Sequence, residues 1–289
     1  MAKASKSFLK WAGGKTKVVP YIKEIIEDIP HKRLVEPFVG SGAVFLHTEF
    51  EEYLLGDINK DLINLFNEIK NDPDKFIRVC KRMFDSPDIY NNQKFYEYAR
   101  KLFNYYKKDT IKYSFELSCL FIYLNRHGFN GMCRYNKKGE FNIPFGRYKT
   151  VYFPKREILN CYEHAKRATF KHVDYKEIFK DIRDGDIIYC DPPYSPISKT
   201  SSFDKYSIEG FSIEDHVELK EICKEYSKKM NIICIISNNI TEFTTDLYSD
   251  ADQLIEIQVR KSIAAKSESR GKVGEYLAVY KKENKNDEN

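Results

Sequence analysis

Short apolar runs that alternate with helical patterns are the feature of this sequence that most constrains its fold. Runs of this length are typical of buried strands, and amphipathic segments lie between most of them. The alternation predicts an α/β fold, in which helices cover a sheet. We predict strands at 34–35, 53–55, 168–173, 187–190, 232–237, 254–259 and 276–280.

A block of more than a hundred residues interrupts this alternation between the second and third runs, and we predict that it is an inserted domain. Its first half is helical, because apolar residues recur at i, i+3, i+4 and i+7 after Leu62, Phe95 and Leu117. Beyond Asn125, glycines alternate with aromatic and basic residues, and 136–139 has the composition of a β-hairpin turn between two short strands. The predicted boundaries are 1–59 and 165–280 for the sheet domain, 60–164 for the insert and 281–289 for a mobile charged tail.

Positive charge gathers in one part of the chain. The whole sequence has a formal net charge of +5 at pH 7, and 125–149 alone carries six Lys or Arg against one acidic residue. Five aromatic residues are interleaved with these cations. Interleaved arginines and rings suit the reading of base edges and the filling of a vacated base stack, so this segment is a candidate surface for double-stranded DNA. A solvated, turn-rich face is the other interpretation that composition leaves open.

The cysteines and histidines argue against a metal site. Seven cysteines are scattered without a C-x-x-C pair, and the six histidines lack the spacing of zinc ligands. We therefore expect reduced thiols and no metal. The N-terminus lacks the apolar stretch of a signal peptide, and the longest apolar runs have the length of strands. We expect no membrane association and a cytoplasmic location.

A glycine-containing turn after the first predicted strand is the candidate cofactor site. Gly40 and Gly42 allow the backbone to approach a ligand closely, and Asp57 ends the next strand, where its carboxylate can accept both hydroxyls of a ribose. The third glycine of a dinucleotide fingerprint is absent, which disfavours nicotinamide and flavin cofactors. Upstream, Trp11 and Lys15 flank two glycines and suit an adenine-bearing ligand with a carboxylate. An ordinary βα turn and a merely packed tryptophan remain the simpler alternatives.

The tetrapeptide Asp191-Pro192-Pro193-Tyr194 follows a predicted strand and is the candidate catalytic motif. An exocyclic adenine amine is a poor nucleophile, because its lone pair is delocalised into the ring. The carboxylate of Asp191 and the carbonyl of Pro192 can accept its two N–H groups, and Tyr194 offers a flat face for a flipped-out base. A sulfonium methyl donor is already activated, so such a site needs no covalent intermediate and no metal. A rigid proline turn is the structural alternative.

These features together resemble the Dam-type DNA adenine methyltransferases of the D12 class. The resemblance spans roughly 8–280 and includes the stretches F-L-K-W-A-G-G-K at 8–15, V-E-P-F-V-G at 35–40, L-N-R at 124–126 and G-E-F-N-I-P-F-G-R-Y at 139–148. It implies a Rossmann-like, S-adenosylmethionine-dependent methyltransferase sheet with an inserted, mainly helical DNA-recognition domain that carries a β-hairpin. It also implies methylation of N6 of adenine in double-stranded DNA, at GATC, by base flipping.

The resemblance assigns residues to roles. The catalytic residues are Asp191, Pro192, Pro193 and Tyr194. The S-adenosylmethionine contacts are Trp11, Lys15, Phe38, Gly40, Asp57, Tyr175 and Asp191. The DNA contacts are Lys10, Arg126, Phe129, Asn130, Met132, Arg134, Pro144, Arg147 and Tyr148, with Phe129 as a wedge beside the flipped adenine. His127, Phe129 and Met132 stand where the family commonly has Tyr, Tyr and Leu, which we expect to bear on flanking-sequence preference and not on the reaction.

Other functions remain open from the sequence alone. Enzymes that methylate N4 of cytosine or the side-chain nitrogen of protein glutamine have similar motifs with a changed first residue, so Asp191 favours adenine without proving it. A DNA-binding module built on a decayed methyltransferase is a different class of alternative. We expect a monomer, and the sequence does not decide between solitary action and partnership with a restriction endonuclease.

Overall fold

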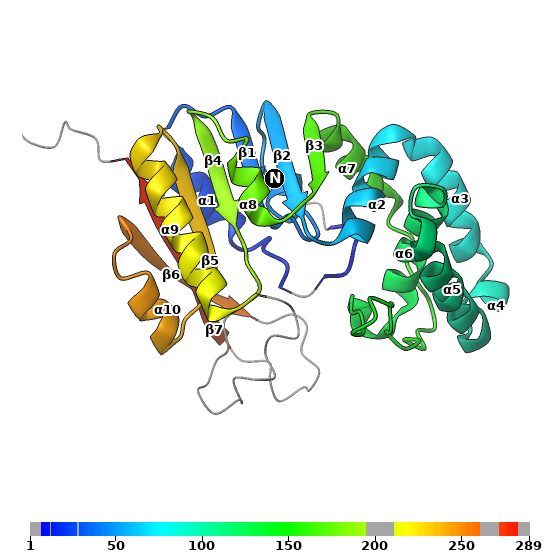
Figure 1. The fold of residues 1–289 in the computed structure, drawn as a ribbon. Coiled ribbons are helices and arrows are strands. Elements are labelled where there is room, and N and C mark those ends of the chain that lie inside the picture. Colours follow the sequence, from blue (N-terminus) through cyan, green and yellow to red (C-terminus); the bar gives the residue numbers. More distant parts are fainter. Residues whose placement is uncertain (1–6, 12, 28, 195–210, 261–271, 283–289) are drawn as a thin grey trace, which may run out of the picture. The chain divides into compact units, whose positions relative to one another are not determined.

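The computed structural model describes residues 7–11, 13–27, 29–194, 211–260 and 272–282 (Figure 1). The predicted tail 281–289 therefore lies almost wholly outside the described residues. The chain forms two compact units, which are treated separately below. Unit 1 draws on 1–16, 40–47 and 57–172, and unit 2 on 17–39, 48–56 and 173–289. The whole predicted insert falls in unit 1, but its boundaries as a functional domain stay a prediction.

A seven-stranded sheet confirms the predicted α/β fold. The strands lie in the order β3-β2-β1-β4-β5-β7-β6. β1 pairs in parallel with β2 and β4, β4 pairs in parallel with β5, and β7 runs antiparallel between β5 and β6. The bounds are β1 Arg33–Glu36, β2 Glu52–Asp57, β3 Ala168–His172, β4 Asp186–Cys190, β5 Ile233–Asn239, β6 Gln253–Arg260 and β7 Lys272–Lys281, each at a predicted run.

The helices of unit 2 are α1 (Val19–Ile26), α8 (Tyr175–Phe179), α9 (Ile213–Lys229) and α10 (Glu242–Leu247). All of β4 and β5 is buried, as expected for strands covered on both faces, and α9 packs on β5 and β7 (Figure 1). Gly56 allows α8 to approach β2, since a Cβ at Gly56 would lie 2.6 Å from the Ile178 side chain. The parallel pairing begins at Arg33, whose Nη2 lies 2.6 Å from the buried carboxylate of Asp186. This ion pair raises the pKa of Arg33.

In unit 1, the insert is built around one buried helix. The helix α6 is buried on every side because it packs against α2, α3 and α5, so its buried residues are not confined to one stripe. Asn59 caps α2 by accepting hydrogen bonds from two backbone amides of its first turn. The bounds are α2 Lys60–Asn71, α3 Pro73–Asp85, α4 Pro87–Tyr90, α5 Gln93–Tyr106, α6 Ser114–His127 and α7 Lys155–Ala165, with short 3₁₀ turns η1 Phe45–His47, η2 Lys107–Asp109 and η3 Phe129–Gly131.

The hairpin in unit 1 differs from the prediction. The turn is present: the Gly139 amide donates to the Asn136 carbonyl at 2.8 Å, and the Asn136 side chain accepts from the amides of Lys138 and Glu140. The two flanking strands are shorter than predicted, because pairing in the described chain is limited here to isolated antiparallel bridges, including Tyr135 to Phe141. Two backbone hydrogen bonds flank this bridge: the Asn136 amide donates to the Glu140 carbonyl at 2.9 Å, and the Asn142 amide donates to the Arg134 carbonyl at 3.1 Å. A side chain from a neighbouring helix adds bonds to the backbone of Phe141, as described below.

The remaining expectations concern thiols, metals and membranes. All seven cysteines are free thiols, and six of them are buried. Within the described ranges, no group of three or more His, Cys, Asp or Glu side chains is placed to hold a metal ion. No helix in those same ranges has both the length and the apolar character needed to cross a membrane.

Candidate active site

The carboxyl ends of three neighbouring parallel strands position the predicted cofactor and catalytic groups. Phe38 follows β1, Asp57 is the last residue of β2 and Asp191 comes directly after β4. Because β1 pairs in parallel with both other strands, these ends share one edge of the sheet. This edge is where open α/β sheets bind ligands.

A network of hydrogen bonds fixes the Asp57 carboxylate against the glycine turn. Its Oδ2 accepts from the Gly40 amide at 3.0 Å, and its Oδ1 accepts from the Asn59 amide at 2.8 Å. Gly40 has φ of +48°, and a Cβ there would lie 3.3 Å from Trp11 Nε1. Burial raises the pKa of Asp57, and the two amides act against that shift. Each oxygen keeps a lone pair that can accept a ligand hydroxyl.

Aromatic rings form a second part of the candidate cofactor site. The rings of Phe38 and Tyr175 stack with centroids 5.3 Å apart, and Phe211 packs against both. The Tyr175 side chain is buried, and its Oη has no hydrogen-bond partner in the part of the chain that the structure describes. Burial raises the pKa of this phenol. A buried hydroxyl of this kind calls for a partner, so the residues present fit an adenine-bearing cofactor.

Lys15 is buried, with 5% of its surface exposed. Pro192 of the catalytic motif is buried and Asp191 is half-buried. The Tyr194 ring, in contrast, is 45% exposed. Its hydroxyl donates a hydrogen bond of 3.1 Å to Oε1 of Glu275 on β7. No local sequence signal predicts this hydrogen bond, because Glu275 lies 81 residues beyond Tyr194 in the chain.

In unit 1, a buried asparagine brings together predicted DNA contacts from distant segments. Asn125 exchanges hydrogen bonds with the backbone of Lys10 at 2.9 and 2.8 Å, and also donates to the Gly131 carbonyl at 3.1 Å. The Lys10 ammonium lies 4.2 Å from the centre of the Tyr148 ring and 3.4 Å from the Arg126 carbonyl. Burial and the charge of Arg126 lower the pKa of Lys10.

Arg126 itself is partly engaged within the fold. Its Nε donates to the Tyr152 carbonyl at 3.2 Å, and its guanidinium lies 5.6 Å from the centre of the Tyr152 ring. Burial lowers the pKa of Arg126. This predicted contact therefore has less freedom than an exposed arginine.

The hairpin presents the remaining candidates. Arg134 is exposed, and its Nε donates to Asn142 Oδ1 at 2.8 Å. The amide of Phe129 donates to the carbonyl of Pro144 at 2.9 Å, while 44% of the Phe129 side chain stays exposed. Met132 is half-buried.

Two of the predicted DNA contacts have unusual backbone conformations. In the described ranges, Asn130 and Arg147 are the non-glycine residues with positive φ, both at 53°. Asparagine tolerates this region, whereas for arginine it costs about 1–3 kcal/mol. Such strain persists where the surrounding structure overdetermines it, and it gathers at functional sites. Neither conformation was predicted from the sequence.

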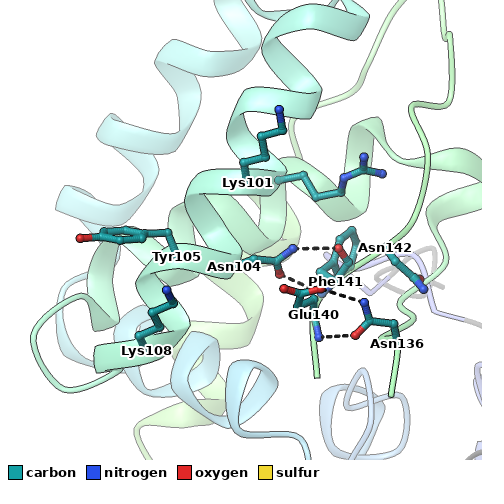
Figure 2. Close-up of a pocket in the computed structure, with 9 residues that line it drawn as sticks. Lys101, Asn104, Tyr105, Lys108, Asn136, Glu140, Phe141 and Asn142 are labelled. Carbon is teal, nitrogen blue, oxygen red and sulfur yellow. Dashed lines mark hydrogen bonds between the residues drawn. The ribbon is translucent and has the colours of Figure 1, made fainter. Parts of the chain in front are cut away.

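Side chains outside the prediction hold the hairpin in place. Asn104 of α5 donates to the Phe141 carbonyl at 3.1 Å and accepts from the Phe141 amide at 2.8 Å, as a strand partner would (Figure 2). Asp61 of α2 accepts from the Tyr135 hydroxyl at 2.8 Å and lies 2.6 Å from the Lys107 ammonium. A hollow of about 540 Å³ lies beside this hairpin, lined by Arg100, Lys101, Asn104, Tyr105, Lys108, Asn136, Glu140, Phe141 and Asn142.

The sequence of this chain matches a family model described as D12 class N6 adenine-specific DNA methyltransferase over residues 11–263. The chain therefore belongs to the D12 class of N6 adenine-specific DNA methyltransferases.

Among its relatives is a protein named DNA adenine methylase from Vibrio cholerae, 44% identical over 279 residues, with 96% of this chain and 97% of the relative aligned. Proteins of the same name from Serratia marcescens and Escherichia coli are each 41% identical over 280 residues, covering 96% of this chain and 100% and 96% of their own. Among solved structures, a delta-N METTL16 MTase domain aligns at 8% identity with a TM-score of 0.41, covering 93% of this chain and 82% of that domain.

Proposed function

We propose that this chain transfers a methyl group from S-adenosylmethionine to N6 of adenine in double-stranded DNA at GATC, after flipping the adenine out of the duplex. The observation that carries the proposal is the shared edge at the carboxyl ends of β2, β1 and β4, which bears Asp57, the glycine turn and Asp191. Membership of the D12 class supports adenine as the target. The names of the relatives support the same reaction.

The residues that would hold the cofactor are those of the two parts of the candidate site. Asp57 would accept the ribose hydroxyls, and the buried hydroxyl of Tyr175 would gain a partner. Trp11, Lys15, Phe38 and Gly40 complete the proposed set, with Asp191 near the reacting methyl. When bound, S-adenosylmethionine supplies a methyl group that its sulfonium has already activated.

The chain's own part in the reaction is to make the amine nucleophilic and to aim it. Asp191 and the Pro192 carbonyl accept the two N–H groups of adenine, so that the nitrogen lone pair is drawn out of the ring system. Pro193 stiffens the turn, because proline fixes its φ near −65°. Positioning of this kind, with fixed acceptors, is sufficient for direct in-line transfer.

Capture of the flipped base falls to two aromatic residues. The exposed ring of Tyr194 offers a face on which the adenine stacks. The exposed ring of Phe129 is a wedge for the space that the adenine leaves. Both rings have the exposure that such contacts need.

Recognition of GATC is assigned to unit 1. Arg134 suits the O6 and N7 of a guanine, and Lys10, prepositioned by Asn125, suits a second base edge. The other proposed contacts to bases or backbone are Arg126, Asn130, Met132, Pro144, Arg147 and Tyr148. In this scheme 60–164 recognises DNA and 1–59 with 165–280 catalyses transfer, and the enzyme acts as a monomer in the cytoplasm, with or without a partner restriction endonuclease.

The test is methyl transfer from radiolabelled S-adenosylmethionine to matched duplexes that carry GATC, GATC already methylated on both strands, or GATC with one base changed. Hydrolysis of the product to nucleosides separates N6-methyladenine from N4-methylcytosine. We expect N6-methyladenine from the unmethylated GATC duplex alone. N4-methylcytosine, label in protein, or equal transfer to every duplex would contradict the proposal.

A further inference from the structure

Tyr194 has an exposed ring and a hydrogen-bonded hydroxyl. Its side chain is 45% exposed, yet its hydroxyl donates to Glu275 Oε1 at 3.1 Å. An exposed aromatic side chain without such a bond samples several rotamers. Fixing the tip restricts the orientation of the ring while nearly half of the side chain stays exposed.

The acceptor is built into the sheet. Glu275 is on β7, opposite Asn239 of β5, and only 4% of its surface is exposed. The same Oε1 that accepts from Tyr194 also accepts from the fully buried Ser237 hydroxyl at 2.6 Å. Burying a carboxylate costs free energy unless hydrogen bonds compensate for the lost hydration. The two hydroxyl donors therefore fix the orientation of the Glu275 side chain.

We propose that Glu275 is a positioning residue for base capture: through the Tyr194 hydroxyl it holds the ring in the orientation on which the flipped adenine stacks. This inference rests on the proposed function, because it assumes that Tyr194 is the stacking platform. Glu275 touches no reacting atom. Its effect is to lower the conformational entropy that Tyr194 would otherwise lose when the base arrives.

Two single variants and their combination isolate this role. Tyr194→Phe keeps the stacking face and removes the donor, and Glu275→Gln keeps the shape of the acceptor and removes its charge. If both act only through the bond between them, the double variant is no worse than either single variant. Independent roles would give additive effects.

The neighbouring residue on β7 provides a matched control. Tyr276 also directs its hydroxyl to a carboxylate, at 3.5 Å from Glu256 Oε1, and it contacts the Thr245 hydroxyl at 3.1 Å. Successive residues of a strand point to opposite faces of the sheet, so this pair lies away from Tyr194. Tyr276→Phe and Glu256→Gln repeat the same chemical changes without touching the proposed platform.

The experiment measures steady-state methylation of a GATC duplex, cofactor affinity by calorimetry, thermal stability, and the fluorescence of 2-aminopurine placed at the target adenine, which rises when the base leaves the stack. For Tyr194→Phe, Glu275→Gln and the double variant we expect KM for DNA to rise about three- to tenfold, the size of one lost hydrogen bond. The fluorescence rise should shrink in parallel. Cofactor affinity should not change, and the control variants should behave as the parent does.

Three outcomes would overturn the proposal: additive effects in the double variant, an unchanged KM and fluorescence in both single variants, or an equal defect in the controls. If Glu275→Gln proves too unstable to assay, Tyr194→Phe alone keeps the test decisive, because its loss of fluorescence must appear without a loss of thermal stability. A parent chain that methylates adenine while its variants are normal overturns this inference alone. A parent chain that transfers nothing to adenine overturns the proposed function and this inference with it.

Discussion

The end of β1 in unit 2 and the hairpin in unit 1 are held in place by different kinds of contact. The first is set by backbone hydrogen bonds, as β1 pairs along its length with β2 and β4. The hairpin has backbone bonds between its own two arms, but side chains attach it to the helices of unit 1: the backbone of Phe141 bonds to a side chain of α5, and Tyr135 bonds to a carboxylate of α2. Backbone pairing survives most substitutions, whereas a side-chain brace is lost with one. The comparison therefore predicts that single substitutions seldom disturb the geometry of the catalytic site. It also predicts that they readily change which DNA sequence is recognised.

The largest effect should come from Asp191→Ala, which removes chemistry while leaving the sheet edge intact. We expect methyl transfer to fall by at least about a thousandfold, because one of the fixed acceptors of the amine is gone. DNA binding should survive, since phosphate contacts dominate affinity. Methyl incorporation and gel shift measure the two quantities, with the exposed Asp85→Ala as the control. Transfer near the parent rate at saturating cofactor would remove Asp191 from the mechanism.

Asp57→Ala should act on cofactor binding more than on chemistry. Hydrogen bonds to a charged acceptor contribute about 1.5–3 kcal/mol each, so losing two ribose contacts should raise Kd for S-adenosylmethionine about a hundredfold or more. Methylation should return at high cofactor concentration. Calorimetry measures the Kd for S-adenosylmethionine of Asp57→Ala and of the milder Asp57→Asn, and we expect the larger increase for Asp57→Ala. An unchanged Kd would show that Asp57 does not contact the cofactor.

Arg134→Ala tests whether the hairpin of unit 1 reads a base of the DNA site. Loss of a bidentate arginine–guanine contact should cost about 1–3 kcal/mol of discrimination at one base pair, while the adenine is still methylated. Rates on GATC and on duplexes changed at single positions measure this. An equal loss on every duplex would instead make Arg134 a backbone contact and move base reading to Lys10 or Asn130.

Asn104→Ala tests the contact between α5 and the hairpin without changing any proposed DNA contact. It removes both bonds to the Phe141 backbone, so we expect discrimination between GATC and altered sites to fall about tenfold, with cofactor affinity unchanged. The exposed Asn71→Ala at the end of α2 is the control. If discrimination in Asn104→Ala equals that of the parent, the hairpin does not depend on this side chain.

The smallest effect is expected for Lys138→Ala at the exposed turn. We expect a lysine at this turn to contact phosphate if it contacts DNA at all, so affinity should weaken alike for all sequences, and the slope of log K against log salt should fall by about one unit. Binding measured at several salt concentrations checks the slope. Altered discrimination at any base pair would contradict this assignment.

The sheet and the motifs were predictable because their signals are local. Apolar runs mark β4 and β5, and Asp191 follows its strand directly in the sequence. The contacts that fasten the functional residues join distant positions: Tyr194 and Glu275 are 81 residues apart, and Tyr135 and Asp61 are 74 apart. No periodicity records such pairs. The short length of the hairpin pairing was missed for the same reason, since the side chain that bonds to the Phe141 backbone, Asn104, belongs to another element.

The bonds of Asn125 have a consequence for attempts to build chimeras. Its amide ties Lys10 to Gly131, and a Cβ at Gly131 would lie 2.2 Å from Lys10 Cβ. The N-terminal segment and the recognition insert therefore have matched surfaces that must be inherited together. Grafting 60–164 from a relative while keeping the native first sixteen residues would join two segments whose contacting residues come from different proteins. A transplant of specificity should move both pieces as one cassette.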